Sequence, residues 1–321
     1  MPDDTVGADR AKDAVSEHSS GFPDALNRLC PICGSSDATD VFCDANIDAA
    51  SLNSYAFASR KLPEYMHHRL ILCPDCDLVY ANPAPRIEAL ASAYEEAAYD
   101  SGEEAEFAAR TYGAYTRKVA ATLPDNCGAI DIGCGDGVFL EKLLDLGFDG
   151  VSGIEPSIAP ILAAKPRIKP LIRQGLFSAA EFEPSSAILI TCFQTIEHVY
   201  DPLQLCVDAH GLLKEGGALF LIGHNRDALS AKLLKTRSPI FDIEHLQLFS
   251  AASFRRLLTE AGYKSVRVFP IFNRYPLHYL VKLFPIPAAN KIALLNGIKR
   301  LRAGYLPVTL ALGNLGAVGY K

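Results

Sequence analysis

From Gly128 onward the chain alternates between short apolar runs and stretches with helical spacing, and this alternation constrains the fold more than any other feature. The apolar runs predict strands at residues 129–133, 151–155, 170–174, 187–193, 218–223 and 265–269. Helical stretches follow several of them, at residues 137–147, 202–213 and 251–262. Strands that alternate with helices favour a parallel sheet covered on both faces. The sequence therefore predicts a doubly wound α/β domain.

A glycine-rich segment, Asp131-Ile-Gly133-Cys-Gly135-Asp-Gly137, follows the first predicted strand. Glycines let the backbone approach a ligand closely, and amides at the helix N-terminus face that ligand. The spacing is G-x-G-x-G, whereas dinucleotide enzymes have G-x-G-x-x-G. Asp131 would repel a pyrophosphate but could hold an ammonium group, and Glu155 can accept both hydroxyls of a ribose. The pattern indicates S-adenosylmethionine, with a ligand-free turn and a nicotinamide dehydrogenase as alternatives.

Four motifs resemble those of class I S-adenosylmethionine-dependent methyltransferases, over about residues 126–270. They are AIDIGCGDGVFL (129–140), GIEPS (153–157), TIEHVYDP (195–202) and LLKEGGALFLIGHN (212–225). The resemblance implies a Rossmann-like methyltransferase sheet. Many relatives have an acid near the adenine after the third strand, where this chain has Gln174-Gly175-Leu176-Phe177, which suggests an apolar sandwich. The expected cofactor-binding residues are Asp131, Gly133, Gly135, Gly137, Glu155, Pro156, Leu176, Phe177, Phe193 and Gln194.

Two cysteine pairs, Cys30-Pro-Ile-Cys33 and Cys73-Pro-Asp-Cys76, precede this region. A C-x-x-C turn points two thiolates at one centre, and two such turns complete a tetrahedral zinc site. Because the protein would supply all four ligands, we expect the zinc to be structural and not catalytic. The alternative is a set of buried or redox-active cysteines.

The cysteine pairs, the segment CDLVYANPAP (76–85) and the tyrosine-rich stretch after it resemble zinc-bearing methyltransferases of sugar and surface-glycan biosynthesis. The chain is similar above all to C-methyltransferases that act on nucleotide-linked deoxysugars, from about Leu29 to Gly262. The resemblance makes sugar C-methylation a hypothesis for this chain.

Two histidines follow the fourth and fifth strands, at the carboxyl edge where ligands of α/β sheets bind. Methyl transfer to a hydroxyl or a carbon acid requires removal of a proton, and histidine has a suitable pKa for this near neutrality. The resemblance to the deoxysugar enzymes implies that Glu244-His245 supplies the base and that His198 also lies in the active site. Asp242 stands where those enzymes have a tyrosine. Alternatively, His198 and Glu197 only pin the loop after the fourth strand.

Composition and pattern divide the chain into five segments. They are a disordered tail (1–28), a zinc-binding module (29–85), a helical cap (86–125), an S-adenosylmethionine-binding methyltransferase domain (126–270) and a basic, apolar lid segment with the last strand or strands (271–321). The cap is expected to form two helices with a break near residues 100–102.

The net charge of −6 is unevenly distributed. Residues 261–321 carry nine Lys or Arg and no Asp or Glu, whereas the remainder has 22 basic and 37 acidic side chains. The acidic body argues against nucleic-acid binding. The basic segment fits an anionic acceptor held by Arg274 and Lys282, or peripheral membrane contact through residues 271–304. The alternative is a solvated face.

These observations predict an S-adenosylmethionine-dependent methyltransferase of a small acceptor, a sugar or glycan-biosynthesis intermediate. A quinone or lipid-linked acceptor and a non-catalytic S-adenosylmethionine-binding module are the alternatives. No run approaches the roughly 18 apolar residues of a membrane span, and the acidic start does not resemble a signal peptide. We therefore expect a cytoplasmic protein, while the sequence indicates neither its oligomeric state nor the methylated atom.

Overall fold

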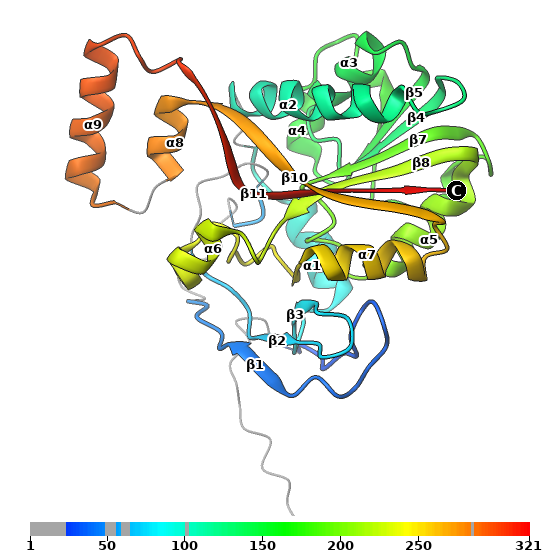
Figure 1. Cartoon of the computed structure of the whole chain (residues 1–321), viewed down its shortest axis with the longest axis horizontal. Helices are drawn as coiled ribbons and strands as arrows, with labels where there is room; N and C mark the ends of the chain where they lie inside the picture. Colours follow the sequence, from blue (N-terminus) through cyan, green and yellow to red (C-terminus); the bar gives the residue numbers. More distant parts are fainter. Residues whose placement is uncertain (1–23, 49–55, 59–64, 100–102, 284–285) are drawn as a thin grey trace, which may run out of the picture.

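A computed structural model describes residues 24–48, 56–58, 65–99, 103–283 and 286–321. Its centre is a seven-stranded sheet in the order β10-β11-β8-β7-β4-β5-β6 (Figure 1). The strands are β4 (Cys127–Ile132), β5 (Asp149–Glu155), β6 (Ile172–Gln174), β7 (Ala187–Phe193), β8 (Leu213–His224), β10 (Ser265–Pro276) and β11 (Pro307–Tyr320). Strands β6, β5, β4, β7 and β8 are parallel, and the antiparallel β11–β10 pair extends the sheet beyond β8. The predicted α/β Rossmann-like sheet is confirmed.

Helices cover both faces of this sheet because its central strands are apolar on both sides. Along β8, Leu219 and Leu221 belong to one buried cluster, while Phe220 and Ile222 belong to the other. This alternation follows from the two-residue repeat of a strand. The first cluster includes side chains of α5 (Pro202–Leu212) and α7 (Ala251–Glu260), and the second includes those of α2 (Glu103–Ala120) and α3 (Val138–Asp145).

Several predicted elements differ from the observed ones at their ends. The run 187–193 coincides with β7, whereas 218–223 extends to Leu213–His224 and 265–269 extends to Ser265–Pro276. The region expected to form two helices contains α1 (Ile87–Glu95) and α2. Other short helices are α4 (Ile158–Ala163), α6 (Leu229–Leu234), η2 (Lys169–Leu171), η3 (Ala179–Glu181) and η4 (Lys235–Arg237).

A smaller antiparallel sheet forms from the cysteine-bearing region and one strand from much later in the chain. Its order is β1 (Asp40–Cys43), β2 (Leu70–Leu72), β3 (Val79–Ala81) and β9 (Gln247–Leu248). The module is therefore not completed by residues 29–85 alone, since β9 follows the predicted catalytic pair. The tail predicted for residues 1–28 also extends too far. Leu26 pairs with Ala84 through two backbone hydrogen bonds of 2.9 Å, and residues 1–23 lie outside the described ranges.

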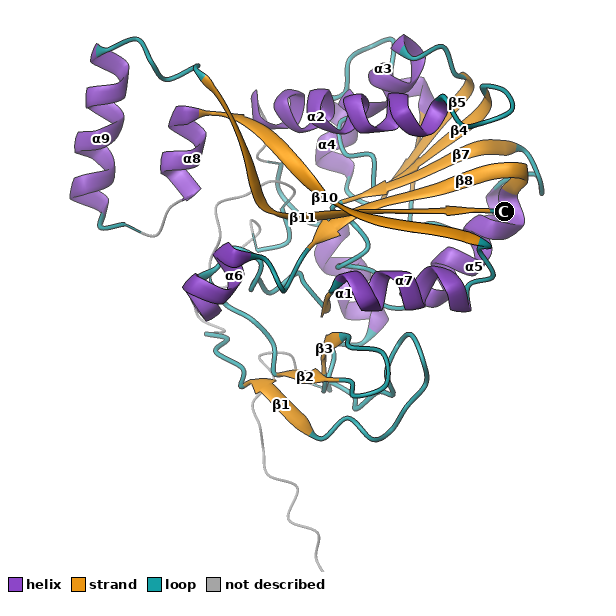
Figure 2. Ribbon diagram, in the orientation of Figure 1, coloured by secondary structure: helices purple, strands orange, loops and turns teal. Residues whose placement is uncertain are grey.

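Strands β10 and β11 form a long hairpin whose connection contains α8 (Leu277–Leu283) and α9 (Ala288–Arg300) (Figure 2). These two helices project beyond one end of the large sheet. None of the helices within the described ranges has both the length and the apolar composition that a membrane span requires.

Candidate active site

The loops at the carboxyl ends of the parallel strands enclose a cavity of about 630 Å³. This volume lies within the range of pockets that hold small molecules. Residues from the glycine loop, the end of β5, the end of β7, the end of β8 and the 238–245 segment line it. Side chains from α1, α6, β10 and α8 complete its walls.

The three loop glycines have different local reasons for being glycine, although all have positive φ. A Cβ on Gly133 would lie 2.3 Å from the Thr195 hydroxyl, and one on Gly137 would lie 2.4 Å from a methyl of Ile168. A Cβ on Gly135 would meet no atom within 4 Å. Gly135 lines the cavity, so its open side is the place where a ligand can approach the backbone.

Glu155 is held in position by two backbone amides, one in the glycine loop and one just after β5. Its Oε2 accepts a hydrogen bond of 2.9 Å from Gly135 N, and its Oε1 accepts one of 2.9 Å from Ser157 N. These two contacts fix the orientation of the Glu155 carboxylate, and Glu155 lines the cavity.

Most of the predicted cofactor residues are brought together around this cavity. Those that line it are Gly133, Gly135, Glu155, Pro156, Leu176, Phe177, Phe193 and Gln194. Asp131 and Gly137 are absent from the lining. The Asp131 carboxylate accepts a 2.6 Å hydrogen bond from the Thr191 hydroxyl on the neighbouring strand, so its role toward an ammonium group stays a prediction.

His198 is paired with a carboxylate inside the same cavity. Its Nδ1 lies 3.2 Å from Glu244 Oε2 and 3.0 Å from the Tyr94 hydroxyl. Burial lowers the pKa of His198, but the hydrogen bond and charge of Glu244 outweigh burial and raise this pKa above its ordinary value. Because an ionised carboxylate only accepts hydrogen bonds, the contact favours the proton on Nδ1 and leaves Nε2 as the basic nitrogen.

His245 lies beside His198 but has a different partner. The two ring centroids are 5.0 Å apart, and His245 Nδ1 donates a 2.8 Å hydrogen bond to the Ile240 carbonyl. Glu244, its neighbour in sequence, therefore supports His198. Both histidines and Glu244 line the cavity.

His224 is a third histidine of this cluster, which the sequence reasoning missed. Its ring centroid lies 4.9 Å from that of His245, and its Nδ1 lies 3.1 Å from Asn314 Oδ1. Burial lowers the pKa of His224. Its place at the carboxyl end of a predicted strand was the available signal.

Glu197 does not line the cavity, but it forms hydrogen bonds to segments that do. Its Oε1 accepts a 2.6 Å hydrogen bond from His224 N, and its carbonyl accepts one of 2.9 Å from Leu246 N. Glu197 thus joins the loop after β7 to the strand end and to the segment that carries Glu244 and His245.

The basic residues predicted to hold an anionic acceptor do not both have described side chains. Arg274 is exposed and absent from the cavity lining, because side chains alternate along β10 and its neighbours Asn273 and Tyr275 face the cavity. The side chain of Lys282 lies outside the described part of the structure.

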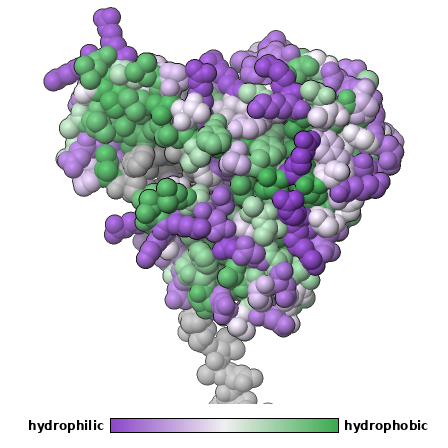
Figure 3. All heavy atoms as spheres, viewed as in Figure 1, coloured by the Kyte–Doolittle hydropathy of each residue, from purple (hydrophilic) through white to green (hydrophobic). Residues whose placement is uncertain are grey.

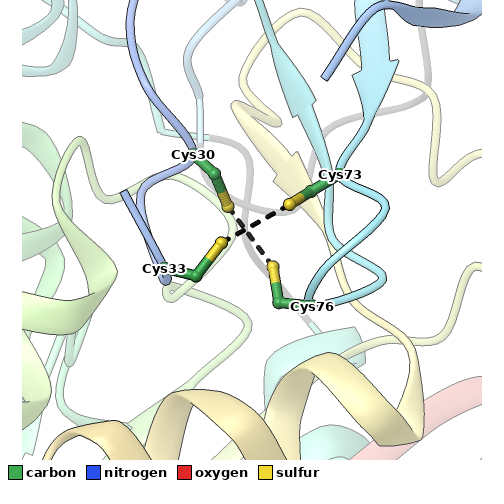
Figure 4. A group of neighbouring side chains, drawn as sticks. All are labelled: Cys30, Cys33, Cys73 and Cys76. Carbon is green, nitrogen blue, oxygen red and sulfur yellow. Dashed lines mark hydrogen bonds between the residues drawn. The ribbon is translucent and has the colours of Figure 1, made fainter. Parts of the chain in front are cut away.

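The four predicted zinc ligands converge on one point (Figure 4). Their sulfur atoms all lie within 4.8 Å of one another, with Cys30 Sγ 3.3 Å from Cys76 Sγ and Cys33 Sγ 3.5 Å from Cys73 Sγ. Sulfurs bound tetrahedrally at about 2.3 Å from zinc lie about 3.8 Å apart. The donor set and its spacing therefore fit one zinc ion, and none of the four cysteines is in a disulfide.

Arg28 links the zinc-side sheet to the histidine-bearing loops, which the sequence reasoning also missed. Its guanidinium donates hydrogen bonds of 3.0 Å to the carbonyls of Ala81, Tyr200 and Leu246, and one of 3.3 Å to Gln247 Oε1. Ala81 ends β3, Tyr200 follows His198 by two residues, and Leu246 directly follows His245. One side chain thus connects three segments that are distant in sequence.

Comparison with known proteins identifies a family and several partial relatives. The family described as "Methyltransferase domain" matches residues 105–268, about half of the chain. Ubiquinone biosynthesis O-methyltransferase of Histophilus somni is 34% identical over 110 residues, which cover 30% of this chain and 44% of that protein. The Pseudomonas aeruginosa protein of the same name is 32% identical over 107 residues, with 30% and 44% covered. The matches thus span less than half the length of these relatives.

A solved structure described as an S-adenosylmethionine-dependent methyltransferase from Archaeoglobus fulgidus is similar with a TM-score of 0.46. Its sequence is 16% identical, and the superposition covers 66% of this chain and 94% of that one.

Proposed function

The chain belongs to the methyltransferase domain family, and we propose that it transfers the methyl group of S-adenosylmethionine to a small hydroxylated acceptor, a sugar or glycan-biosynthesis intermediate. The observation that carries the proposal is a single cavity lined by both Glu155 with the glycine loop and the His198–Glu244 pair. The first set suits binding of the methyl donor, and the second suits removal of a proton from the acceptor.

The glycine loop and the residues around Glu155, which we call the cofactor half of the cavity, fit S-adenosylmethionine. The open side of Gly135 admits a ligand to the backbone, and Glu155 presents a carboxylate for ribose hydroxyls. Gln194 Nε2 is buried and has no hydrogen-bond partner within the described part of the chain, so it has a hydrogen bond to donate to a ligand. Leu176 and Phe177 provide apolar surface for the adenine. When bound, the cofactor supplies an electrophilic methyl group on a sulfonium.

The His198–Glu244 pair is proposed as the general base. Glu244 holds the proton of His198 on Nδ1, so Nε2 can accept the proton that the acceptor loses. The Glu244 charge then stabilises the resulting imidazolium. The walls of the cavity position the acceptor, which is expected to contribute much of the rate enhancement. His245, in ring contact with His198, is the alternative base.

The cavity is also lined by polar side chains that suit a hydroxyl-rich acceptor. Asn273 is 2% exposed, and its Oδ1 has no hydrogen-bond partner within the described ranges. A buried acceptor atom of this kind favours a ligand that donates a hydrogen bond. Asp242 and Asn314 also line the cavity. These side chains support a sugar-like acceptor over a wholly apolar one.

A quinone or another lipid-linked phenol is the second candidate acceptor. The ubiquinone biosynthesis O-methyltransferases that match part of the chain favour it. Tyr275, Tyr279 and Ile240 give the cavity apolar walls that an aromatic ring could contact. Both candidates use the same donor site and the same base.

Zinc is proposed to be structural, and the protein is proposed to be cytoplasmic. Four cysteine ligands would close the coordination sphere, leaving no position for a substrate. None of the nine cysteines is in a disulfide, which fits a reducing compartment.

The proposal is tested first by calorimetric titration with S-adenosylmethionine. We expect Glu155→Gln to weaken binding by about 2 kcal/mol or more, because charge-assisted hydrogen bonds to the ribose are lost. Glu141→Gln is the matched control, since Glu141 is also a buried acid but pairs with Lys165 and Arg167 away from the cavity. Equal affinity of the wild-type protein and Glu155→Gln would reject the donor site.

The acceptor is tested by comparing metabolites of a strain that lacks the gene with those of the complemented strain. Loss of a methylated sugar or glycan intermediate supports the first candidate, and loss of a methylated quinone supports the second. If S-adenosylmethionine binds but no methylated metabolite changes, the chain is a non-catalytic S-adenosylmethionine-binding protein.

A further inference from the structure

The end of the molecule formed by α6, α8 and α9 exposes apolar side chains from two distant parts of the chain. Leu229 and Leu233 of α6 are each 73% exposed, and Leu301, which follows α9, is 80% exposed. Figure 3 shows apolar side chains gathered over α8 and α9 and again over α6, on the same face. We call these exposed residues the apolar end: Leu229, Leu233, Ile292, Leu294, Leu301, Tyr305 and Leu306.

Basic side chains accompany the apolar end in both parts of the chain. Residues 228–241 contain three Lys or Arg and no acid, and residues 286–321 contain five Lys or Arg and no acid. Exposed members are Lys232, Lys235, Arg237, Lys299, Arg300 and Arg302. One of them, Lys232, lies 3.4 Å from Asp227 at the border of the surface. With these basic residues beside the exposed leucines, the surface is both apolar and cationic.

The cavity reaches the elements that carry this surface. Ser230 and Leu234 of α6 line it, and so do Tyr275 at the end of β10 and Tyr279 of α8. The exposed Leu229 and Leu233 are sequence neighbours of the lining residues Ser230 and Leu234. Helix α6 thus contributes both to the cavity wall and to the apolar end, and α8 contributes to the cavity wall.

We propose that the apolar end docks on the surface of a bilayer that contains anionic lipids. Leucine and tyrosine side chains would enter the boundary between headgroups and acyl chains, while the flanking Lys and Arg contact phosphates. The positive charge of the apolar end favours an anionic bilayer over a second copy of the chain as its partner. A symmetric dimer through this surface would place two cationic patches against each other, whereas an anionic bilayer neutralises them.

Docking in this orientation brings α6 and α8, which line the cavity, to the membrane. If the proposed methyl transfer holds, the acceptor is then a molecule attached to the bilayer by an apolar tail, presenting its polar group to Asn273 and His198. This consequence rests on the proposed function, but the docking itself does not.

The test is cosedimentation of the full chain with vesicles, without cofactor or acceptor. Binding is expected with phosphatidylcholine vesicles that contain phosphatidylglycerol and to fall sharply with phosphatidylcholine alone. Raising the salt to about 0.5 M is expected to weaken it, because exposed charges are screened. Leu229→Ser with Leu233→Ser is expected to lower the partition coefficient by about tenfold or more. Replacing Lys299, Arg300 and Arg302 by Gln is expected to lower it by about fivefold per charge.

Leu162→Ser is the matched control, since Leu162 is 63% exposed on α4, which packs beside β6 at the opposite edge of the sheet. Unchanged thermal unfolding and unchanged S-adenosylmethionine affinity would show that the substituted surface leaves the fold and the cofactor half intact. Docking is overturned if anionic vesicles do not bind the protein at low salt, or if the leucine and control variants bind equally. It is also overturned if light scattering shows a dimer that the leucine variant dissociates and vesicles do not bind.

Discussion

At the scale of single residues, Glu244 is the side chain whose partner could not be read from its neighbours in sequence. It precedes His245, yet its carboxylate lies 3.2 Å from His198 Nδ1. The carboxylate stabilises the charged imidazole, which is why the pKa of His198 rises in spite of burial. A histidine base acts in its neutral form, so the rate should increase as pH rises through this pKa.

We expect Glu244→Gln to shift the acidic limb of the kcat/KM pH profile to lower pH. Glutamine keeps an oxygen that can accept from Nδ1 but carries no charge, so the imidazolium loses its stabilisation. His198→Ala is expected to lower kcat by about 10²- to 10⁴-fold. The measurement is the pH profile with saturating S-adenosylmethionine. A full loss of activity in His245→Ala, with activity retained in His198→Ala, would assign the base to His245 instead.

Arg28 holds together three segments of the chain that are distant from it in sequence, two of which lie next to His198 and His245. Removing its guanidinium takes one donor from each of three carbonyls, of which the Leu246 carbonyl keeps a 2.7 Å hydrogen bond from Ala81 N. We expect Arg28→Met to lower the free energy of unfolding by about 2–4 kcal/mol in denaturant titrations. We also expect kcat to fall while S-adenosylmethionine affinity is retained, because the displaced loops carry the histidines.

The control for Arg28 is Arg110→Met, since the Arg110 side chain is 67% exposed and contacts Glu106 and Phe107 on its own helix. A split between kcat and cofactor affinity distinguishes positioning from general loss of stability. If Arg28→Met unfolds like the Arg110 variant, the linking role assigned to Arg28 is wrong.

At the scale of elements, the two cysteine turns and β9 make the small sheet a support for the catalytic segment. β3 pairs with β9 at Val79–Leu248 and Tyr80–Gln247, and β9 begins two residues after His245. The zinc site would hold the turn that leads into β3. Zinc is therefore expected to affect turnover through the position of the histidine loop, without touching the acceptor.

We expect metal analysis to give about one zinc per chain and Cys73→Ser to release it. Limited proteolysis should then cut within residues 24–85, and turnover should fall more than S-adenosylmethionine affinity. Cys43→Ser is the control, since Cys43 lies in the same sheet, 3.6 Å from His67 and outside the four-sulfur cluster. A zinc-free protein that resists proteolysis as well as the zinc-loaded one would contradict the prediction.

At the scale of the whole molecule, local motifs predict the sheet and several parts of the cavity, whereas long-range pairing does not follow from them. The glycine loop, Glu155 and the cysteine turns are recognisable because each requirement is met within a few neighbouring residues. His224 contacts Asn314, and β9 pairs with β3, so both depend on partners far along the chain. Asn273 lines the cavity because β10 lies beside distant segments in the folded protein. No rule of sequence spacing relates residues that are so far apart, so their roles can be recognised only in the folded structure.

The place of β11 in the large sheet has a consequence for how the protein is made. β11 lies between β8 and β10, although it follows both in the sequence. During synthesis the parallel strands can pair early. In contrast, β8 cannot pair with β11 along its whole length until residue 320 has left the ribosome. Until then β8 exposes an edge with unsatisfied backbone groups. The nascent chain should therefore depend on chaperones for longer than its early glycine loop would suggest, and final closure of the sheet should be a late, slow step.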